Sequence, residues 1–125
     1  MLFDTDILIW LQRGKLEAAH FVSDEEERKI STQTYMELLQ CARSKHQHLV
    51  VKNFLQEFGF EILPLTENIG NRATVYIEEY TLSSGLRSGD ALVAATAIEN
   101  NLILGTSNRK HFKDIKGLQL KLFHP

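Results

Sequence analysis

The sequence predicts an α/β fold in three layers, with helices on both faces of a central parallel sheet of about four or five short strands. Two observations support this prediction. Short apolar or alternating runs recur between stretches with helical spacing, which is the pattern of strands joined by helices. One of these runs, residues 102–104, is apolar throughout, as is typical of a strand buried in a parallel sheet.

Length and composition indicate one domain, residues 1–125, with a core large enough to fold without disulfides or structural metals. The net charge of −2 argues against a protein coated in positive charge, but it is compatible with a local basic patch. The single cysteine, Cys41, suits a reducing cytoplasm, and its apolar neighbours predict a buried side chain. Because the sequence shows neither a signal peptide nor a membrane-spanning run, we expect a cytoplasmic protein with no membrane contact.

The first predicted element is a short strand that ends at Asp4 and leads into a helix with its body over residues 7–12. The chain must turn at Asp4 and Asp6, because an ionised carboxylate inside a continuous apolar run would have no water and no partner. Thr5 or Asp6 is the expected N-cap, and Gly14 the expected left-handed end of the helix. Asp4 would then lie at the carboxyl end of a strand, where α/β sheets bind ligands, although helix capping alone explains it about equally well.

The middle of the chain continues the alternation. Apolar residues at helical spacing predict helices over residues 15–26, 33–44 and 49–58. Ile30 is the centre of a short strand between the first two, and residues 60–65 form a strand with Pro64 near its end.

The last part opens with a long helix that Thr66 caps and Gly85 ends. The patterns after it predict, in order, a helix opened by Ser88 over residues 89–100, a strand over 102–104, a polar loop or helical turn over 108–114, and a half-buried edge strand over 118–123.

Glu37 lies at the margin of the apolar face of its helix, one turn before Cys41. Its side chain either pairs with a lysine at the surface or points into a cleft. Taken alone, the position favours the surface ion pair.

Asp90 heads the inward face of its helix, because Ala94, Ala97 and Ile98 follow it at helical spacing. A negative charge at a helix N-terminus is favourable by about 0.3–1 kcal/mol. That benefit explains why an acid stands near the start of the helix, but not why it faces the core.

Three acids from separate segments therefore lie near apolar faces, namely Asp4, Glu37 and Asp90. If they converge, their repulsion requires a cation, and hard oxygen ligands select Mg²⁺ or Mn²⁺. The histidines and the cysteine lack the spacing of a zinc site. With no Ser-His or Cys-His signature and no glycine-rich phosphate loop, metal-assisted hydrolysis of a phosphodiester suits these residues best.

Four segments carry a resemblance to a known family: Phe-Asp4-Thr-Asp-Ile-Leu-Ile, Thr-Tyr-Met-Glu37-Leu-Leu-Gln, Gly-Asp90-Ala-Leu-Val-Ala-Ala-Thr-Ala-Ile and Leu-Gly-Thr106-Ser-Asn108-Arg-Lys-His-Phe. In order and spacing they resemble the motifs of PIN-domain ribonucleases, most closely the small toxins of VapC type, over essentially the whole chain. The resemblance implies a PIN-like fold and a Mg²⁺- or Mn²⁺-dependent endoribonuclease that leaves a 5′-phosphate and a 3′-hydroxyl. It also implies a homodimer and a cognate VapB-like antitoxin that occludes the acidic site.

By position, the residues that match the family's metal-binding acids are Asp4, Glu37 and Asp90. Asn108 stands where many members have Asp, and we count it with the catalytic residues. Asp6 stands where Asn is common, so it is a candidate further ligand that restores the charge missing at Asn108. Thr5 and Thr106 are expected to support the site.

Four basic residues near these motifs are candidates for holding RNA phosphates, namely Arg87, Arg109, Lys110 and Lys113. The alternative for each of them is an ordinary charged surface residue without a partner.

Two other functions compete with the nuclease. A phosphatase of the haloacid-dehalogenase type would use the Asp-x-Asp pair, with a covalent phosphoryl group on Asp4. A module that keeps the fold but has lost turnover would bind RNA or antitoxin without cutting, and Asn108 is the reason to consider it.

Overall fold

A single parallel sheet forms the centre of the computed structural model, which describes residues 1–125. Its strands lie in the order β3-β2-β1-β4-β5, and every neighbouring pair is parallel. The strands are β1 (Leu2–Phe3), β2 (Arg28–Ser31), β3 (Phe60–Leu63), β4 (Leu104–Thr106) and β5 (Leu120–Leu122).

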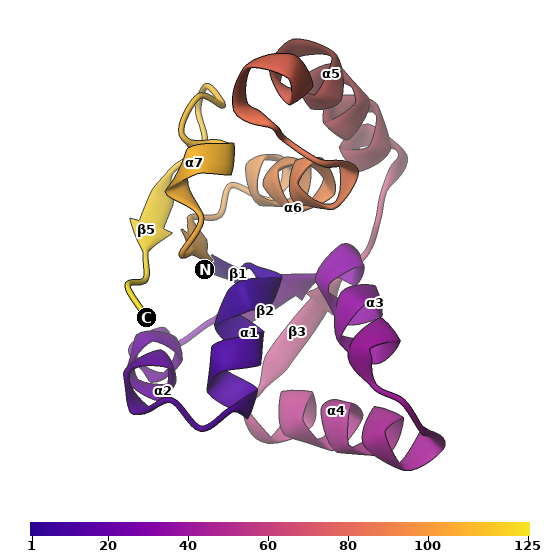
Figure 1. Ribbon diagram of the computed structural model, residues 1–125, viewed down its shortest axis with the longest axis vertical. Helices are drawn as coiled ribbons and strands as arrows, with labels where there is room; N and C mark the ends of the chain where they lie inside the picture. The colour runs from indigo at the N-terminus through magenta and orange to yellow at the C-terminus, as the bar shows by residue number, and fades with distance from the viewer.

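Helices cover both faces of the sheet, which confirms the predicted three-layer α/β/α architecture (Figure 1). In that view α5 and α6 lie above the sheet, and α1, α2 and α4 lie below it. The helices are α1 (Thr5–Gln12), α2 (Leu16–Ser23), α3 (Thr32–Cys41), α4 (Lys45–Glu57), α5 (Glu67–Ser84), α6 (Ser88–Glu99) and α7 (Arg109–Phe112). None of them combines the length and apolar character needed to span a membrane.

The core is divided into two apolar clusters, one on each face of the sheet. Neighbouring strand residues point to opposite faces, so Leu2 packs with the α5 and α6 side while Phe3 packs with α1, α2 and α4. The helix α6 is buried on nearly all sides, as its apolar sequence predicts. Both faces of β1, the central strand, are therefore sealed from water. A polar site can form where this strand ends, at Asp4.

The element boundaries differ from the predictions where side chains cap the helices. Asp4, and not Thr5 or Asp6, is the N-cap of α1, because its carboxylate accepts a hydrogen bond from the Thr5 N–H. The helix α4 begins before the predicted residue 49, because Ser44 caps it through the Gln47 N–H. Asp4 therefore caps α1 and is also the first residue after β1.

Two further predictions were wrong in detail. Cys41 was expected to be buried, but it is the last residue of α3 and is exposed. The strand predicted over residues 102–104 lies two positions later, over Leu104–Thr106, because its pairing with β1 and β5 fixes it there.

The order of the strands places a crevice between β1 and β4. The chain runs from β1 to β2 and β3 in one direction, and β4 and β5 then add on the other side of β1. At such a switch point the connections leave the strands in opposite directions, and ligands bind at the carboxyl ends. Phe3 pairs with Gly105 in register, so Asp4 and Thr106 leave the sheet side by side.

Candidate active site

A pocket of about 250 Å³ opens where β1 and β4 end. Its lining residues are Asp4, Thr5, Asp6, Ile9, Glu37, Asp90 and Asn108. Every acid that the sequence nominated as a catalytic or metal-binding residue, together with Asn108, therefore lines one pocket. A larger hollow of about 470 Å³ lies over α5, but its one acid, Glu99, is paired with Arg72.

Asp4 is the most deeply buried acid of the pocket, with 8% of its surface exposed. The Thr5 N–H donates to its Oδ1 and the Thr106 hydroxyl to its Oδ2, each at 2.8 Å. The pKa of Asp4 is raised to about 7, first by burial and then by the nearby charges of Asp6 and, less strongly, Asp90, against the lowering effect of the two hydrogen bonds. The protein therefore holds a carboxyl group whose charge is costly without a compensating cation.

A buried chain of hydroxyl groups joins α1 to α3 beneath the pocket. Thr5 Oγ1 donates to Thr34 Oγ1 at 3.1 Å, and Ser31 Oγ lies 3.2 Å from the same hydroxyl. Ser31 also caps α3 through the Thr34 N–H. Because Glu37 is one turn further along α3, this chain fixes the helix that presents Glu37 relative to Asp4. Thr5 therefore contacts both Asp4 and Thr34, and its role in supporting the site stays a prediction.

Glu37 faces the pocket and pairs with no lysine, contrary to the surface ion pair that its position alone favoured. Its Oε1 accepts a 3.0 Å hydrogen bond from Gln33 Nε2, one turn earlier on α3. The N-terminal end of α6 comes close to this pair at Gly89, where a Cβ atom would lie 3.1 Å from Glu37 Oε1. A glycine at this position lets the two helices approach and brings Glu37 toward Asp90.

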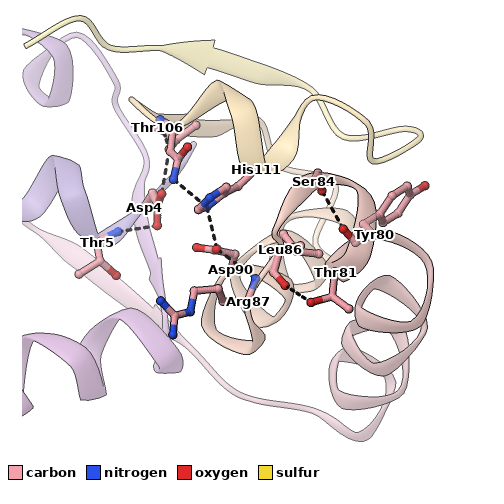
Figure 2. A network of polar contacts seen from close by, with 11 residues as sticks. Asp4, Thr5, Tyr80, Thr81, Ser84, Leu86, Arg87, Asp90, Thr106 and His111 are labelled. Carbon is pink, nitrogen blue, oxygen red and sulfur yellow. Dashed lines mark hydrogen bonds and ion pairs between the residues drawn. The ribbon is translucent and has the colours of Figure 1, made fainter.

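Asp90 both caps the start of α6 and faces the pocket, the two explanations that the sequence left open for it. Its Oδ2 accepts a long, 3.4 Å hydrogen bond from the Arg87 N–H at the start of α6, so it serves the helix N-terminus. The same oxygen lies 3.0 Å from His111 Nδ1, and the carboxylate lines the pocket. Figure 2 shows the His111 ring reaching across to Asp90 near Asp4 and Thr106.

Asp6 is held by the loop that follows β4. Its Oδ2 accepts hydrogen bonds from the backbone N–H of Ser107, at 3.1 Å, and from the Ser107 hydroxyl. Its Oδ1 is buried and has no hydrogen-bond partner. A buried acceptor without a donor is costly, so Asp6 is the acid of the pocket with the clearest need for a further partner.

Three residues in contact with the site were not identified from the sequence: Gln33, Ser107 and His111. The available signal was spacing. Gln33 precedes Glu37 by four positions on one helix, and His111 follows Asn108 by three in a predicted turn, so each pair shares a face. Ser107 offered no such signal, because its contact with Asp6 depends on the crossing of distant segments.

The predicted RNA-binding residues surround the start of α6 and the short helix α7. Arg87 is the N-cap of α6, Arg109 and Lys110 lie on α7, and Lys113 follows it. All four are exposed, and none takes part in an ion pair. They are available to phosphates, and their role in RNA binding stays a prediction.

The donor atoms of the pocket suit a hard divalent cation. Carboxylate, amide and hydroxyl oxygens line it, and it contains no cysteine or histidine. No group of three or more acids, histidines or cysteines is already arranged to hold a metal ion. Three of the acids, Asp6, Glu37 and Asp90, are anchored through one oxygen and leave the second without a hydrogen bond. The residues therefore fit such an ion by their chemistry, with one free oxygen on each anchored acid.

The fold and the pocket together define an α/β protein with an acidic site at the switch point of a parallel sheet. The chain belongs to the PIN domain family, whose model matches residues 1–118. It is 30% identical over 126 residues to ribonuclease VapC1 of Rickettsia felis, across 96% of this chain and 93% of that protein. These matches confirm the resemblance seen in the four motifs and remove the basis for the phosphatase alternative.

Solved structures agree with this assignment. A toxin–antitoxin complex from Klebsiella pneumoniae contains a chain with a TM-score of 0.79 and 34% identity, over 94% of this chain and 93% of that one. The fold is also shared with a chain of VapBC2 from Rickettsia felis bound to a DNA fragment from its promoter, with a TM-score of 0.78, 22% identity and 98% of both chains covered.

Proposed function

We propose that this chain is an endoribonuclease that hydrolyses RNA phosphodiester bonds with Mg²⁺, for which Mn²⁺ can substitute, and that it is the toxin of a toxin–antitoxin pair. The observation that carries the proposal is the presence of four carboxylates in one pocket at the carboxyl ends of β1 and β4. The relationship to ribonuclease VapC1 supports RNA as the substrate.

The metal ion would be held by Asp4, Glu37 and Asp90, with Asp6 as a further ligand. When bound, a divalent cation offsets charge on the scissile phosphate and lowers the pKa of the attacking water. In this scheme the Thr106 hydroxyl and the Thr5 N–H orient Asp4, since each donates to a different oxygen of its carboxylate. The raised pKa of Asp4 supports the proposal, because a neighbouring cation favours the ionised form that burial opposes.

The exposed basic residues would hold the RNA on either side of the cut. Arg87 stands next to the helix that carries Asp90, and Arg109 and Lys110 follow Asn108 directly. Phosphate contacts of this kind position a nucleic acid without reading its sequence. The acidic pocket between them would repel the phosphate backbone unless a cation were present, which again favours a metal-dependent reaction.

The proposed partners are a cognate VapB-like antitoxin and a second copy of the chain. The toxin–antitoxin complex from Klebsiella pneumoniae supports an antitoxin partner. In the proposal the antitoxin occludes the acidic pocket and so keeps RNA from reaching it. A cytoplasmic location follows from the substrate.

The test is cleavage of end-labelled structured RNAs by the purified chain without antitoxin, in Mg²⁺, Mn²⁺ or EDTA. Asp4→Asn and Asp90→Asn are compared with Glu26→Gln, which removes an exposed acid outside the pocket. Discrete cuts are expected with metal only, in the wild type and in Glu26→Gln, and neither site variant is expected to cut.

Other outcomes would contradict the proposal. Retention of RNA without cleavage in any metal would favour the binding module that Asn108 suggests. Cleavage that persists in EDTA, or in both site variants, would separate the activity from the acidic pocket.

A further inference from the structure

His111 connects two residues of the acidic pocket. Its Nδ1 lies 3.0 Å from Asp90 Oδ2 and 2.8 Å from the amide nitrogen, Nδ2, of Asn108. Its side chain is 26% exposed, so the ring is largely enclosed. One ring nitrogen therefore contacts Asp90, near the start of α6 (Figure 2). The same nitrogen contacts Asn108, which immediately precedes α7.

The chemistry of the two partners decides where the hydrogen on this nitrogen lies. An ionised carboxylate only accepts hydrogen bonds, so Nδ1 faces Asp90 favourably only when it carries the hydrogen. A ring nitrogen that carries a hydrogen has no lone pair in the ring plane, so it cannot accept a hydrogen bond from the Asn108 amide N–H. Because the oxygen and nitrogen of an amide exchange places on a half-turn of the group, Asn108 satisfies the arrangement by presenting Oδ1 to His111, and the one Nδ1 hydrogen is then shared between Asp90 Oδ2 and Asn108 Oδ1 in a three-centre bond.

The contacts of Asp90 are divided unevenly between its two oxygens. Both the Arg87 N–H and His111 Nδ1 lie near Oδ2, at 3.4 and 3.0 Å, and no hydrogen bond reaches Oδ1. His111 therefore fixes the rotation of the carboxylate through one oxygen and leaves the other available. Partners that orient a metal-binding carboxylate in this way influence affinity without touching the metal.

We infer that His111 is a positioning residue of the proposed metal site, which donates its Nδ1–H to Asp90 Oδ2 and leaves Oδ1 for the cation. This inference rests on the proposed function. It also gives Asn108 a specific task, which is to hold His111 through its amide oxygen and act on the metal through His111 and Asp90. An asparagine at this position then contributes to the site without a negative charge.

The experiment compares His111→Ala with His111→Asn, and uses His46→Ala as a control because His46 is exposed and makes no side-chain hydrogen bond. Asparagine places an amide N–H close to where His Nδ1 stands, so it keeps the donor and removes the rest of the ring. Calorimetric titration with Mn²⁺ alone is expected to show affinity about 10–100-fold lower in His111→Ala. In His111→Asn the affinity is expected to return to within a few-fold of the wild type, and thermal melting verifies that each variant is folded.

A second measurement needs no metal. The ring-nitrogen chemical shifts of ¹⁵N-labelled His111 in EDTA are expected to show a protonated Nδ1 in the wild type and a change to the usual Nε2–H form in Asp90→Ala. A wild-type His111 with a bare Nδ1 would overturn the inference, and so would unchanged Mn²⁺ affinity in folded His111→Ala. Equal losses in His111→Ala and His111→Asn would show that the hydrogen bond is not what matters. A wild type that neither binds Mn²⁺ nor cuts RNA defeats the proposed function, and the nitrogen shifts still decide whether His111 holds Asp90.

Discussion

The Thr106 hydroxyl donates a 2.8 Å hydrogen bond to Asp4 Oδ2, although 102 positions separate the two residues in the sequence. The same hydroxyl oxygen accepts a 3.0 Å hydrogen bond from the Asn108 N–H. One buried side chain therefore orients the central acid of the pocket and fixes the start of the loop that carries Asn108. The connection depends on the direct pairing of β1 with β4.

Replacement of Thr106 by valine, which has nearly the same shape, should remove both of these hydrogen bonds. The Asn108 N–H and Asp4 Oδ2 would lose a buried partner, and we expect the free energy of unfolding to fall by about 1–3 kcal/mol. The pKa of Asp4 should rise further, because this hydrogen bond lowers it. Denaturant unfolding measures the first effect. Thr106→Ser keeps the hydroxyl and should stay near the wild type, and a valine variant as stable as the wild type would contradict the argument.

Asp4→Asn should change how stability depends on pH in the absence of metal. A carboxyl group whose pKa is raised by folding contributes stability that is present below its ordinary pKa of 3.8 and is lost as the pH rises through about 7. Asparagine does not ionise and has no such loss. In EDTA, we therefore expect the variant to gain on the order of 2–4 kcal/mol relative to the wild type between about pH 4 and pH 8. A pH-independent difference between the two proteins would show that Asp4 titrates normally.

Exchange of the residues at positions 6 and 108 tests whether Asp6 supplies the charge that Asn108 lacks. Asp6→Asn removes a carboxylate whose Oδ1 is buried without a partner, and it should weaken Mn²⁺ binding in calorimetry by roughly tenfold or more. The double variant Asp6→Asn/Asn108→Asp restores the number of charges and should recover most of the affinity. Failure of the double variant to recover would mean that the site needs the carboxylate at position 6 itself, and an unaffected Asp6→Asn would remove Asp6 from the ligands.

Gly89→Ala should separate metal binding from stability. The added Cβ would lie 3.1 Å from Glu37 Oε1 and 3.3 Å from Gln33 Nε2, which are flexible side-chain ends that can move aside. We expect the melting temperature to hold or rise slightly, since alanine favours a helix by up to about 1 kcal/mol over glycine. Mn²⁺ affinity should fall several-fold as Glu37 is displaced. Gly70→Ala is the matched control, because its Cβ would meet nothing within 4 Å.

Loss of the basic residues should weaken RNA binding in a salt-dependent way. Single alanine substitutions of Arg87, Arg109, Lys110 and Lys113 should each lower the slope of log K against log salt concentration by about 1, with RNA binding measured at constant Mg²⁺ in the Asp90→Asn background, which is not expected to cut. Lys45→Ala, on the exposed start of α4, is the control. A slope that is unchanged in all four variants would place the RNA elsewhere on the surface.

The elements with strong local signals could be predicted from the sequence. Thr66 and Gly85 mark the ends of α5 as expected, because an N-cap hydroxyl and a left-handed glycine act within one turn of the chain. The position of β4 could not be predicted from local signals. Its residues Gly105 and Thr106 look like a loop, and only pairing with β1 and β5 makes them a strand.

The residues of the candidate site also differ in whether local sequence signals predict them. Asp4, Glu37 and Asp90 could be nominated because an acid beside an apolar face needs an explanation. Their convergence in one pocket agrees with the resemblance of the motifs to the PIN family. The contact of His111 with Asp90 could not be foreseen, because a histidine in a polar turn has many uses and Asp90 lies on another helix. Such contacts follow from the packing of α6 against α7, which local spacing does not encode.

The place of β4 in the sheet also has a consequence for protein synthesis. The amino-terminal half of the chain contains Asp4, Asp6 and Glu37, but the partners of Asp4 and Asp6 stand on Thr106 and Ser107, and β4 is itself flanked by β5. As the chain emerges from a ribosome, Asp4 and Asp6 are therefore present long before the hydrogen bonds from Thr106 and Ser107 that orient them. The pocket cannot form until Asp90, Thr106, Ser107 and Asn108 have been synthesised, so most of the chain must be made before its acids stand in one site.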